Sequence, residues 1–160
     1  MSDLRIGQGF DVHGIKAGDY VILGGVKIAA PFSLAGFSDA DVLTHALTDA
    51  MLGALALGDI GVHFPPGVKE NKDRNSLEFL AYAKELVKKE GYTLSNADCT
   101  VICEKPKIAP YAGQIQEQLA KILEVHHNQV SIKGTTTEKL GFTGRGEGIA
   151  AQAIVLLRAI

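Results

Sequence analysis

The alternation of β-type and helix-type segments restricts the fold of this chain more than any other feature. Residues typical of strands dominate four segments: 4–13, 20–29, 98–104 and 129–138. Apolar residues recur at helical spacing in three others: 38–57, 76–90 and 111–124. The sequence therefore predicts an α+β fold, a two-layer α/β sandwich in which one mixed β-sheet packs on helices.

Three local signals refine this prediction. Gly24 and Gly25 separate the two β-rich halves of "YVILGGVKIA", which indicates a hairpin. Ser38 or Asp39 is the expected N-cap of the helix in 38–57. The C-terminal "GEGIAAQAIVLLRAI" is apolar at nearly every position, which predicts either a last strand or an apolar helix. Its apolar excess fits a central strand or burial against another subunit.

Length and composition bound the class of protein. The 160 residues suit one domain spanning 1–160. A net charge of -2 and the absence of a long apolar run give no basis for nucleic-acid or membrane partners. The N-terminus lacks the layout of a secretory signal, and Cys99 and Cys103 are expected to be buried thiols. We therefore expect a cytoplasmic protein.

Two short segments carry the residue types of a metal site. Asp11 and His13 in "GFDVHG" would point to one side of an extended strand. His45 lies in "SDADVLTHALTD", with Asp41 and Asp49 four residues to either side. If that helix packs over the strand, two histidines and a carboxylate form the three-ligand set of catalytic zinc, and Asp41 or Asp49 would orient an imidazole. The alternative is ordinary polar surface.

Two further segments suit a ligand. Hydroxyls and tight glycine turns in "GTTTEKLGFTGRGEG" suit phosphate oxygens, and Glu138 could hold a hard cation such as Mg²⁺. The alternative is a plain strand and turn. In "CEKPKIAP", Pro106 and Pro110 fix the backbone where a strand ends, which leaves polar groups free for a ligand or forms a simple exit turn.

Three of these segments together resemble the 2-C-methyl-D-erythritol 2,4-cyclodiphosphate synthase family of the non-mevalonate isoprenoid pathway. They are "RIGQGFDVH", "SDADVLTHALTDAMLGALALGDIG" and "TTTEKLGFTGRGEGIA", in the family's order and spacing. The resemblance implies a lyase-class enzyme and a homotrimer with active sites between subunits. It implies conversion of 4-diphosphocytidyl-2-C-methyl-D-erythritol 2-phosphate to the 2,4-cyclodiphosphate, with release of CMP, by attack of the substrate's own phosphate on the β-phosphorus.

The resemblance also assigns residues. It places Zn²⁺ on Asp11, His13 and His45, and a second cation, Mg²⁺ or Mn²⁺, on Glu138. Thr136 would be catalytic, and Phe37 stands at the position of a usual catalytic histidine. The implied substrate-binding residues are Asp11, His13, Phe37, Ser38, Asp59, Ile60, Gly61, Phe64, Cys103, Pro106, Lys107, Ala109, Thr135, Thr136, Thr137, Glu138, Phe142 and Arg145.

Within that set the resemblance distributes roles. The methylerythritol hydroxyls would meet 59–61, the cytidine 103–109, and the phosphates Thr135 and Thr136. The residues Phe142, Arg145 and Glu147 would line a central cavity of the trimer that can hold an isoprenoid diphosphate.

Four features depart from the family pattern. Phe37 cannot donate a hydrogen bond or carry charge, and "FPPGV" at 64–68 lacks two acids of the usual "FPDTD". Gly134 replaces a usual alanine, and Gln8 a frequent histidine. The first two leave two alternatives beside an active synthase: a zinc-binding trimeric relative with weak or no turnover, and a metal-dependent phosphohydrolase.

Overall fold

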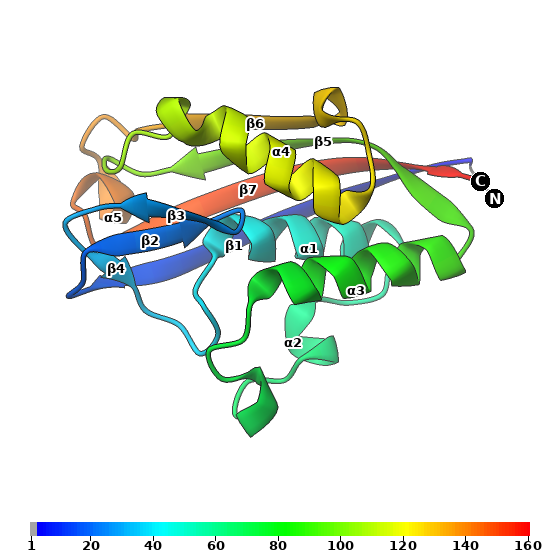
Figure 1. Ribbon diagram of the computed structural model, residues 1–160, viewed down its shortest axis with the longest axis horizontal. Helices are drawn as coiled ribbons and strands as arrows, with labels where there is room; N and C mark the ends of the chain where they lie inside the picture. The colour runs from blue at the N-terminus through cyan, green and yellow to red at the C-terminus, as the bar shows by residue number, and fades with distance from the viewer. Residues whose placement is uncertain (1–2) are drawn as a thin grey trace.

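A five-stranded mixed sheet forms one layer of the molecule (Figure 1). The computed structural model describes residues 3–160. The strand order is β4-β1-β7-β5-β6; β5 and β6 are parallel, and the other neighbouring strands are antiparallel. The strands are β1 (Leu4–Lys16), β4 (Ser33–Leu34), β5 (Tyr92–Ile102), β6 (Val130–Thr135) and β7 (Gly148–Ala159).

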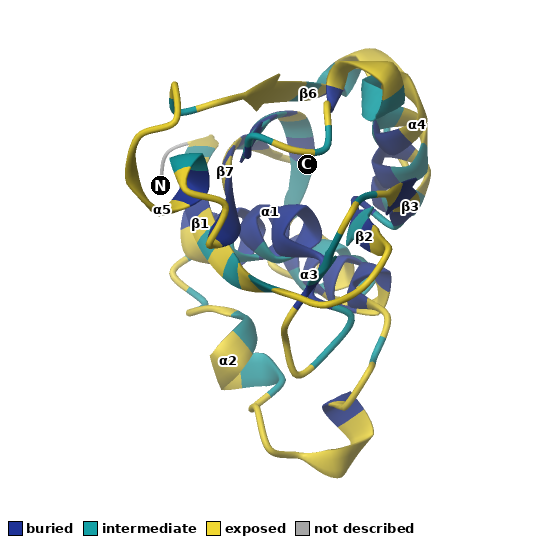
Figure 2. Ribbon diagram, turned by 90° about the vertical axis from the view of Figure 1, so that its left-hand side faces the viewer, coloured by how far each residue is buried: buried dark blue, intermediate teal, exposed yellow. Residues whose placement is uncertain are grey.

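Three long helices form the second layer, and all lie on the same side of the sheet (Figure 2). They are α1 (Val42–Ala54), α3 (Ser76–Lys89) and α4 (Ala112–Leu123). Shorter elements are α2 (Ile60–His63), α5 (Gly141–Gly144) and the 3₁₀ turns η1 (Lys69–Asn71), η2 (Ala109–Tyr111) and η3 (His127–Gln129). The predicted two-layer α+β architecture is therefore confirmed.

The predicted hairpin is formed by β2 (Tyr20–Leu23) and β3 (Val26–Ala29), which pair antiparallel. Its turn residues Gly24 and Gly25 have φ of 59° and 74°, a conformation that favours glycine. The hairpin lies beside the helices rather than in the main sheet (Figure 1).

The C-terminal segment is a strand, not a helix, and it is central. β7 pairs with β1 on one side and β5 on the other, so its backbone groups are used on both edges. Its residues Ala151, Ala153, Val155 and Leu157 are fully buried. This central position explains the apolar excess of the C-terminal sequence.

Helix α1 begins later than the sequence suggested. The prediction of Ser38 or Asp39 as N-cap is wrong, because Asp41 caps the helix by accepting from the Thr44 backbone N–H at 3.0 Å. The same carboxylate accepts the backbone N–H of Gly24 at 2.9 Å and of Gly25 at 2.7 Å. Asp41 therefore ties the hairpin to the start of α1, which explains its complete burial.

Helix α1 lies unusually close to β1. A Cβ placed on Gly9 would lie 1.8 Å from the backbone oxygen of Ala46, and one on Gly7 would lie 1.9 Å from that of Ala50. Only glycine at these two strand positions allows the helix to approach so closely. This contact brings the side chains that follow Gly9 in the strand next to those on α1.

Replacing Gly53 by alanine should raise the free energy of unfolding by about 0.5–1 kcal/mol. Gly53 lies exposed in the last turn of α1, and a Cβ there would have its nearest neighbour at 3.9 Å, the Gln8 backbone oxygen. Urea denaturation measures the change. Gly58→Ala is the matched control and should destabilise, because Gly58 has φ of 83°. Equal effects of the two substitutions would contradict this account.

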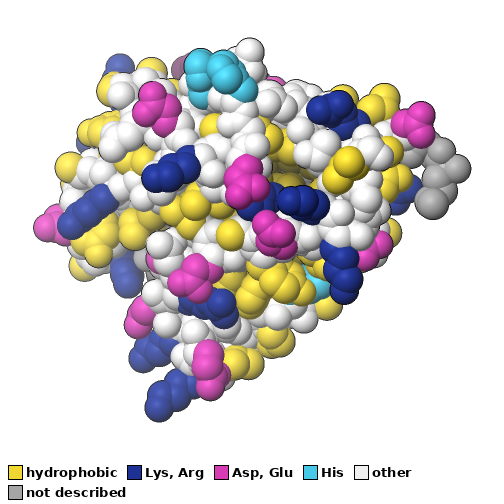
Figure 3. Space-filling view, turned by 45° about the vertical axis from the view of Figure 1, so that its right-hand side comes forward, with side chains coloured by type: hydrophobic (Ala, Val, Ile, Leu, Met, Phe, Trp, Pro, Cys, Tyr) yellow, Lys and Arg dark blue, Asp and Glu magenta, His cyan; other side chains and the backbone are white. Residues whose placement is uncertain are grey.

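The surface is mixed in charge on the face that Figure 3 presents, where Lys and Arg side chains are interspersed with Asp and Glu. This agrees with the small net charge of the chain. Within residues 3–160, no helix has both the length and the apolar character that crossing a bilayer requires.

Candidate active site

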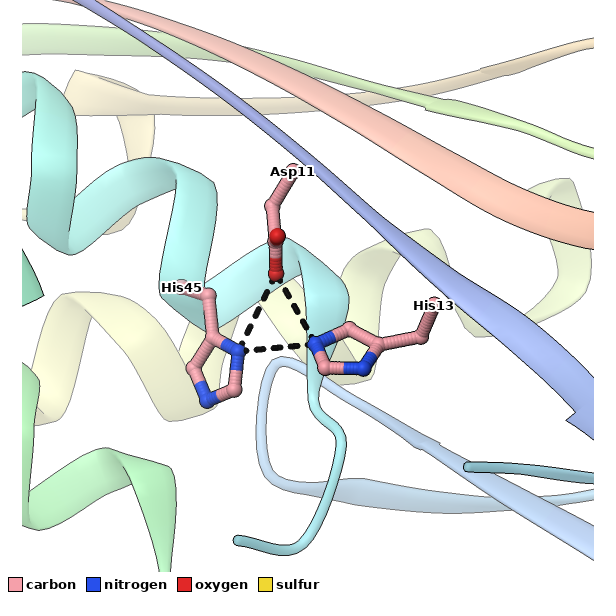
Figure 4. Close-up of side chains that lie close together, drawn as sticks. All are labelled: Asp11, His13 and His45. Carbon is pink, nitrogen blue, oxygen red and sulfur yellow. Dashed lines mark hydrogen bonds and ion pairs between the residues drawn. The ribbon is translucent and has the colours of Figure 1, made fainter. Parts of the chain in front are cut away.

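Asp11, His13 and His45 converge on one point, as the sequence predicted (Figure 4). The Asp11 Oδ2 atom lies 3.0 Å from His13 Nε2 and 3.1 Å from His45 Nδ1. The two ring nitrogens lie 3.1 Å from each other. The strand β1 supplies the first two residues at i and i+2, and α1 supplies His45 across the close contact at Gly9.

The far side of each ring has its own partner. His13 Nδ1 donates to the backbone oxygen of Ala35 at 2.8 Å, which leaves the Nε2 lone pair facing the centre of the cluster. His45 Nε2 lies 2.6 Å from Ser76 Oγ and 3.1 Å from Ser38 Oγ. The outer partner of each imidazole is thus a backbone or hydroxyl oxygen.

The prediction that Asp41 or Asp49 orients an imidazole is wrong. Asp41 is fully committed to the hairpin and the cap of α1. Asp49 accepts the backbone N–H of Ile60 at 2.8 Å and so holds the start of α2. Both carboxylates position backbone around the site and make no hydrogen bond to a ring.

Charges within the cluster shift the pKa values of its members. Burial alone would raise the pKa of Asp11, but its contacts with the His13 and His45 rings outweigh burial and lower that pKa from 3.8 to about 2. Burial opposes charge on the His13 ring, but the Asp11 carboxylate beside it raises the pKa of His13 above 6.5. Without a metal, His13 therefore keeps its proton to a higher pH than a free imidazole does, and a cation bound there would have to displace that proton.

The donor set fits a tetrahedral divalent cation. Ligand atoms about 2.0–2.2 Å from a tetrahedral zinc lie about 3.3–3.6 Å from one another, a few tenths of an ångström more than the separations found here. Two imidazole nitrogens and one carboxylate leave a fourth position open. Among residues 3–160, this is the one group of three or more His, Cys, Asp or Glu residues with such geometry.

A pocket of about 220 Å³ opens beside the two histidines. Besides His13, five of the substrate-binding residues that the family resemblance implied line it: Phe37, Ser38, Ile60, Gly61 and Phe64. Asp59 is not among the lining residues; it caps α2 by accepting the Val62 backbone N–H at 3.1 Å.

A second pocket, of about 250 Å³, lies where β5 and β6 end. It gathers the residues that the resemblance assigned to cytidine and phosphates: Cys103, Pro106, Lys107, Ala109, Thr135 and Thr136. Cys103 is buried and not reactive, since burial raises the pKa of its thiol to about 11. The two pockets share no lining residue, so within one chain the two halves of the predicted site are separate.

The remaining predicted residues lie in the turn after β6. Thr137 Oγ1 donates to the Leu140 backbone oxygen at 2.6 Å and so holds the turn together. Glu138 is exposed and has φ of 55°. Phe142 is 41% exposed, and Arg145 Nε donates to Glu147 Oε2 at 2.6 Å. Arg145 also lines a pocket of about 400 Å³ with Phe32, Glu104 and other residues.

Several residues at the pocket beside the two histidines could not be recognised from the sequence. Pro66, Asn71 and Phe79 line it, and Ser76 and Asp39 lie behind His45. The "RNSLEF" segment carried a helix-start signal, with Asn75 as the N-cap, but nothing in it indicated contact with a histidine 31 positions away.

Comparison with known proteins shows the family of this chain. Residues 4–158 match the model of the YgbB family. The 2-C-methyl-D-erythritol 2,4-cyclodiphosphate synthase of Geobacillus kaustophilus (strain HTA426) is 57% identical over 154 residues, 96% of this chain and 98% of that protein. The synthase of Xanthomonas axonopodis pv. citri (strain 306) is 54% identical over 158 residues, 99% and 95% of the two chains. IspF of Plasmodium falciparum, solved as a CDP complex, superimposes with a TM-score of 0.88 at 38% identity, covering 99% of both chains. Because the family model and these relatives cover nearly the whole chain, the protein belongs to the YgbB family.

Proposed function

We propose that the protein is a cyclodiphosphate synthase that acts on 4-diphosphocytidyl-2-C-methyl-D-erythritol 2-phosphate. An oxygen of the substrate's 2-phosphate attacks the β-phosphorus, the bond from that phosphorus to the oxygen bridging it to the CMP phosphate breaks, and CMP leaves. The products are CMP and the 2,4-cyclodiphosphate. The convergence of Asp11, His13 and His45 is the observation that carries the proposal. The relatives that match nearly the full chain are synthases of this name, which supports it.

No protein nucleophile is needed for this reaction, because the substrate supplies its own. The protein has to hold the two phosphate groups within reach of each other and neutralise their charge. Asp11, His13 and His45 would hold Zn²⁺, and Glu138 would hold Mg²⁺ or Mn²⁺. When bound, such cations act as Lewis acids toward phosphoryl oxygens.

The two pockets divide the substrate between them. The pocket at the ends of β5 and β6 would take the cytidine, and the CDP bound in the Plasmodium falciparum structure supports a cytidyl diphosphate ligand. Hydroxyls of Thr135 and Thr136 would donate to the phosphates. The pocket beside His45 would take the methylerythritol, with 59–61 meeting its hydroxyls. Phe37 closes that pocket with an apolar wall in place of a hydrogen-bond donor.

We further propose a homotrimer. Each active site would combine the pocket beside His45 of one subunit with the pocket at the ends of β5 and β6 of its neighbour. The face of the sheet away from the helices is apolar and exposed, as Leu4, Ile6, Phe10 and Ile154 illustrate. Burial against other subunits would cover it. The same assembly would surround Phe142, Arg145 and Glu147 with a central cavity for an isoprenoid diphosphate.

Replacing Ile6 by aspartate should dissociate this trimer. Ile6 is 72% exposed on β1, so a charge there would stay in water in a lone subunit but would be buried in an interface. Sedimentation velocity should give a trimer for the wild type and a monomer for the variant, with turnover lost. The control is Val68→Asp, an exposed apolar residue in the loop before η1, which should remain trimeric. A monomeric wild type would contradict the assembly.

Zinc affinity should rise by about tenfold per pH unit up to the pKa of His13 and level off above it. The raised pKa means that the His13 ring keeps its proton to a pH above 6.5, and zinc must displace that proton. Competition with a chromogenic chelator from pH 5.5 to 8.5 measures the slope. A dissociation constant that is independent of pH would contradict binding at His13.

Phosphorus NMR of the substrate incubated with protein, Zn²⁺ and Mg²⁺ tests the reaction itself. The expected result is the cyclodiphosphate with one equivalent of CMP. CMP together with a linear phosphate would instead indicate a phosphohydrolase that uses water. Unchanged substrate, with zinc bound, would indicate a binding relative that lacks turnover.

A further inference from the structure

The hydroxyl of Ser76 makes the shortest contact to the His45 ring. Ser76 Oγ lies 2.6 Å from His45 Nε2, the nitrogen that points away from Asp11 and His13. Ser76 is the first residue of α3 and is completely buried. A buried hydroxyl so close to a ring nitrogen shares one proton with it, and the neighbouring groups determine which atom donates.

Asp39 determines the direction of that hydrogen bond. Its carboxylate accepts from the Ser76 hydroxyl through Oδ1 and from the Ser76 backbone N–H through Oδ2 at 2.9 Å. It also accepts the backbone N–H of Asp41 at 3.1 Å. A serine hydroxyl has a single proton, and here that proton points to Asp39. The remaining lone pair of Ser76 Oγ therefore accepts from His45 Nε2–H.

We propose that Ser76 and Asp39 are positioning residues that keep the proton of His45 on Nε2 and so leave the Nδ1 lone pair for the metal. The inference rests on the proposed metal site. Ligating histidines commonly donate their other N–H to a carboxylate or a backbone oxygen, and here a serine relays that role to a carboxylate. The relay joins the loop before α1 to the first turn of α3, so packing of both helices fixes the ring plane.

The contact between Asp39 and Ser76 also explains why Asp39 does not cap α1. Asp39 was expected to cap α1, but its side chain instead binds the first residue of α3, 37 positions further along the chain. Ser38 Oγ offers a second, longer contact to the same ring nitrogen at 3.1 Å. Its own hydroxyl has no carboxylate that directs it among the hydrogen bonds of the described residues.

The protonation of His45 can be read directly in the metal-free wild-type protein. With ¹⁵N-labelled histidine, a long-range ¹H–¹⁵N correlation distinguishes a protonated from an unprotonated ring nitrogen. In the neutral ring of His45 we expect Nε2 to carry the proton and Nδ1 to carry none. An unprotonated Nε2 would overturn the inference, and this measurement needs no variant.

Ser76→Ala tests the consequence for the metal. We expect the zinc dissociation constant to rise about 10–100-fold, the usual effect of losing the outer partner of a ligand. The visible absorption of the Co²⁺ form should change as well, because the ring can rotate. The matched control is Ser33→Ala, which removes a hydroxyl that donates to the Tyr20 backbone oxygen at 2.7 Å, away from the cluster.

Wild-type zinc affinity and an unchanged Co²⁺ spectrum in Ser76→Ala would overturn the inference. Neither measurement involves turnover, so the reaction and the relay can fail separately. A protonated Nε2 and weakened zinc binding in Ser76→Ala, without formation of cyclodiphosphate, would contradict the proposed reaction and support the relay. Turnover together with an unprotonated Nε2 would support the proposed reaction and contradict the relay.

Discussion

His45→Ala should lower kcat/KM by about 10³-fold or more and abolish stoichiometric zinc binding. The substitution removes one of three ligands and leaves Asp11 and His13 on β1 without a partner from α1. A bound cation contributes several kcal/mol of charge stabilisation to phosphoryl transfer, and each 1.4 kcal/mol corresponds to about tenfold in rate. Steady-state CMP release and metal analysis after dialysis measure the two effects.

The control for this substitution is His127→Ala. His127 is exposed at η3 and stacks on His126, with ring centroids 4.2 Å apart, and it touches neither pocket. Its replacement removes the same side chain and should leave zinc content and turnover at wild-type values. If His45→Ala retained both, the cluster would not be the metal site of the enzyme.

Gly9→Ala should lower the free energy of unfolding by about 3 kcal/mol, at the upper end of the usual cost of overpacking. The added Cβ would lie 1.8 Å from the Ala46 backbone oxygen, and a helix backbone cannot yield as a flexible side chain does. Helix α1 must move away from β1, which also moves His45 away from Asp11 and His13. Zinc affinity should therefore fall together with stability.

Gly14→Ala is the matched control on the same strand. A Cβ at Gly14 would have only the Glu147 backbone oxygen within 4 Å, at 3.9 Å. Urea denaturation and zinc titration of both variants should therefore separate them clearly. A Gly9→Ala protein with wild-type stability and wild-type zinc affinity would contradict the idea that this glycine sets the distance between strand and helix.

Local periodicity predicted the elements that carry the metal cluster, and the family resemblance joined the three residues into one site. Asp11 and His13 share a side of any strand, and a helix containing His45 was clear from its apolar spacing. The fold class followed from the same periodicities. Periodicity could not decide between strand and helix for the C-terminal segment, because a strand buried on both faces loses the alternation that identifies it.

Contacts between segments that are far apart in the sequence could not be predicted from local residue patterns. The segment "SDAD" offers several good capping residues, and Asp41 is selected by the hairpin turn at Gly24 and Gly25, not by its neighbours in sequence. The Ser76 contact depends on how α3 packs against α1. The separation of the two pockets within one chain likewise appears only in three dimensions.

The most direct test of the account is a zinc titration of metal-free protein in the presence of Mg²⁺ and substrate. We predict that CMP and cyclodiphosphate formation will be negligible without zinc, rise linearly with added zinc and level off at one equivalent per chain. The His45→Ala protein should show no such rise. Full turnover by zinc-free protein with Mg²⁺ alone would contradict the claim that Asp11, His13 and His45 hold the cation on which the reaction depends.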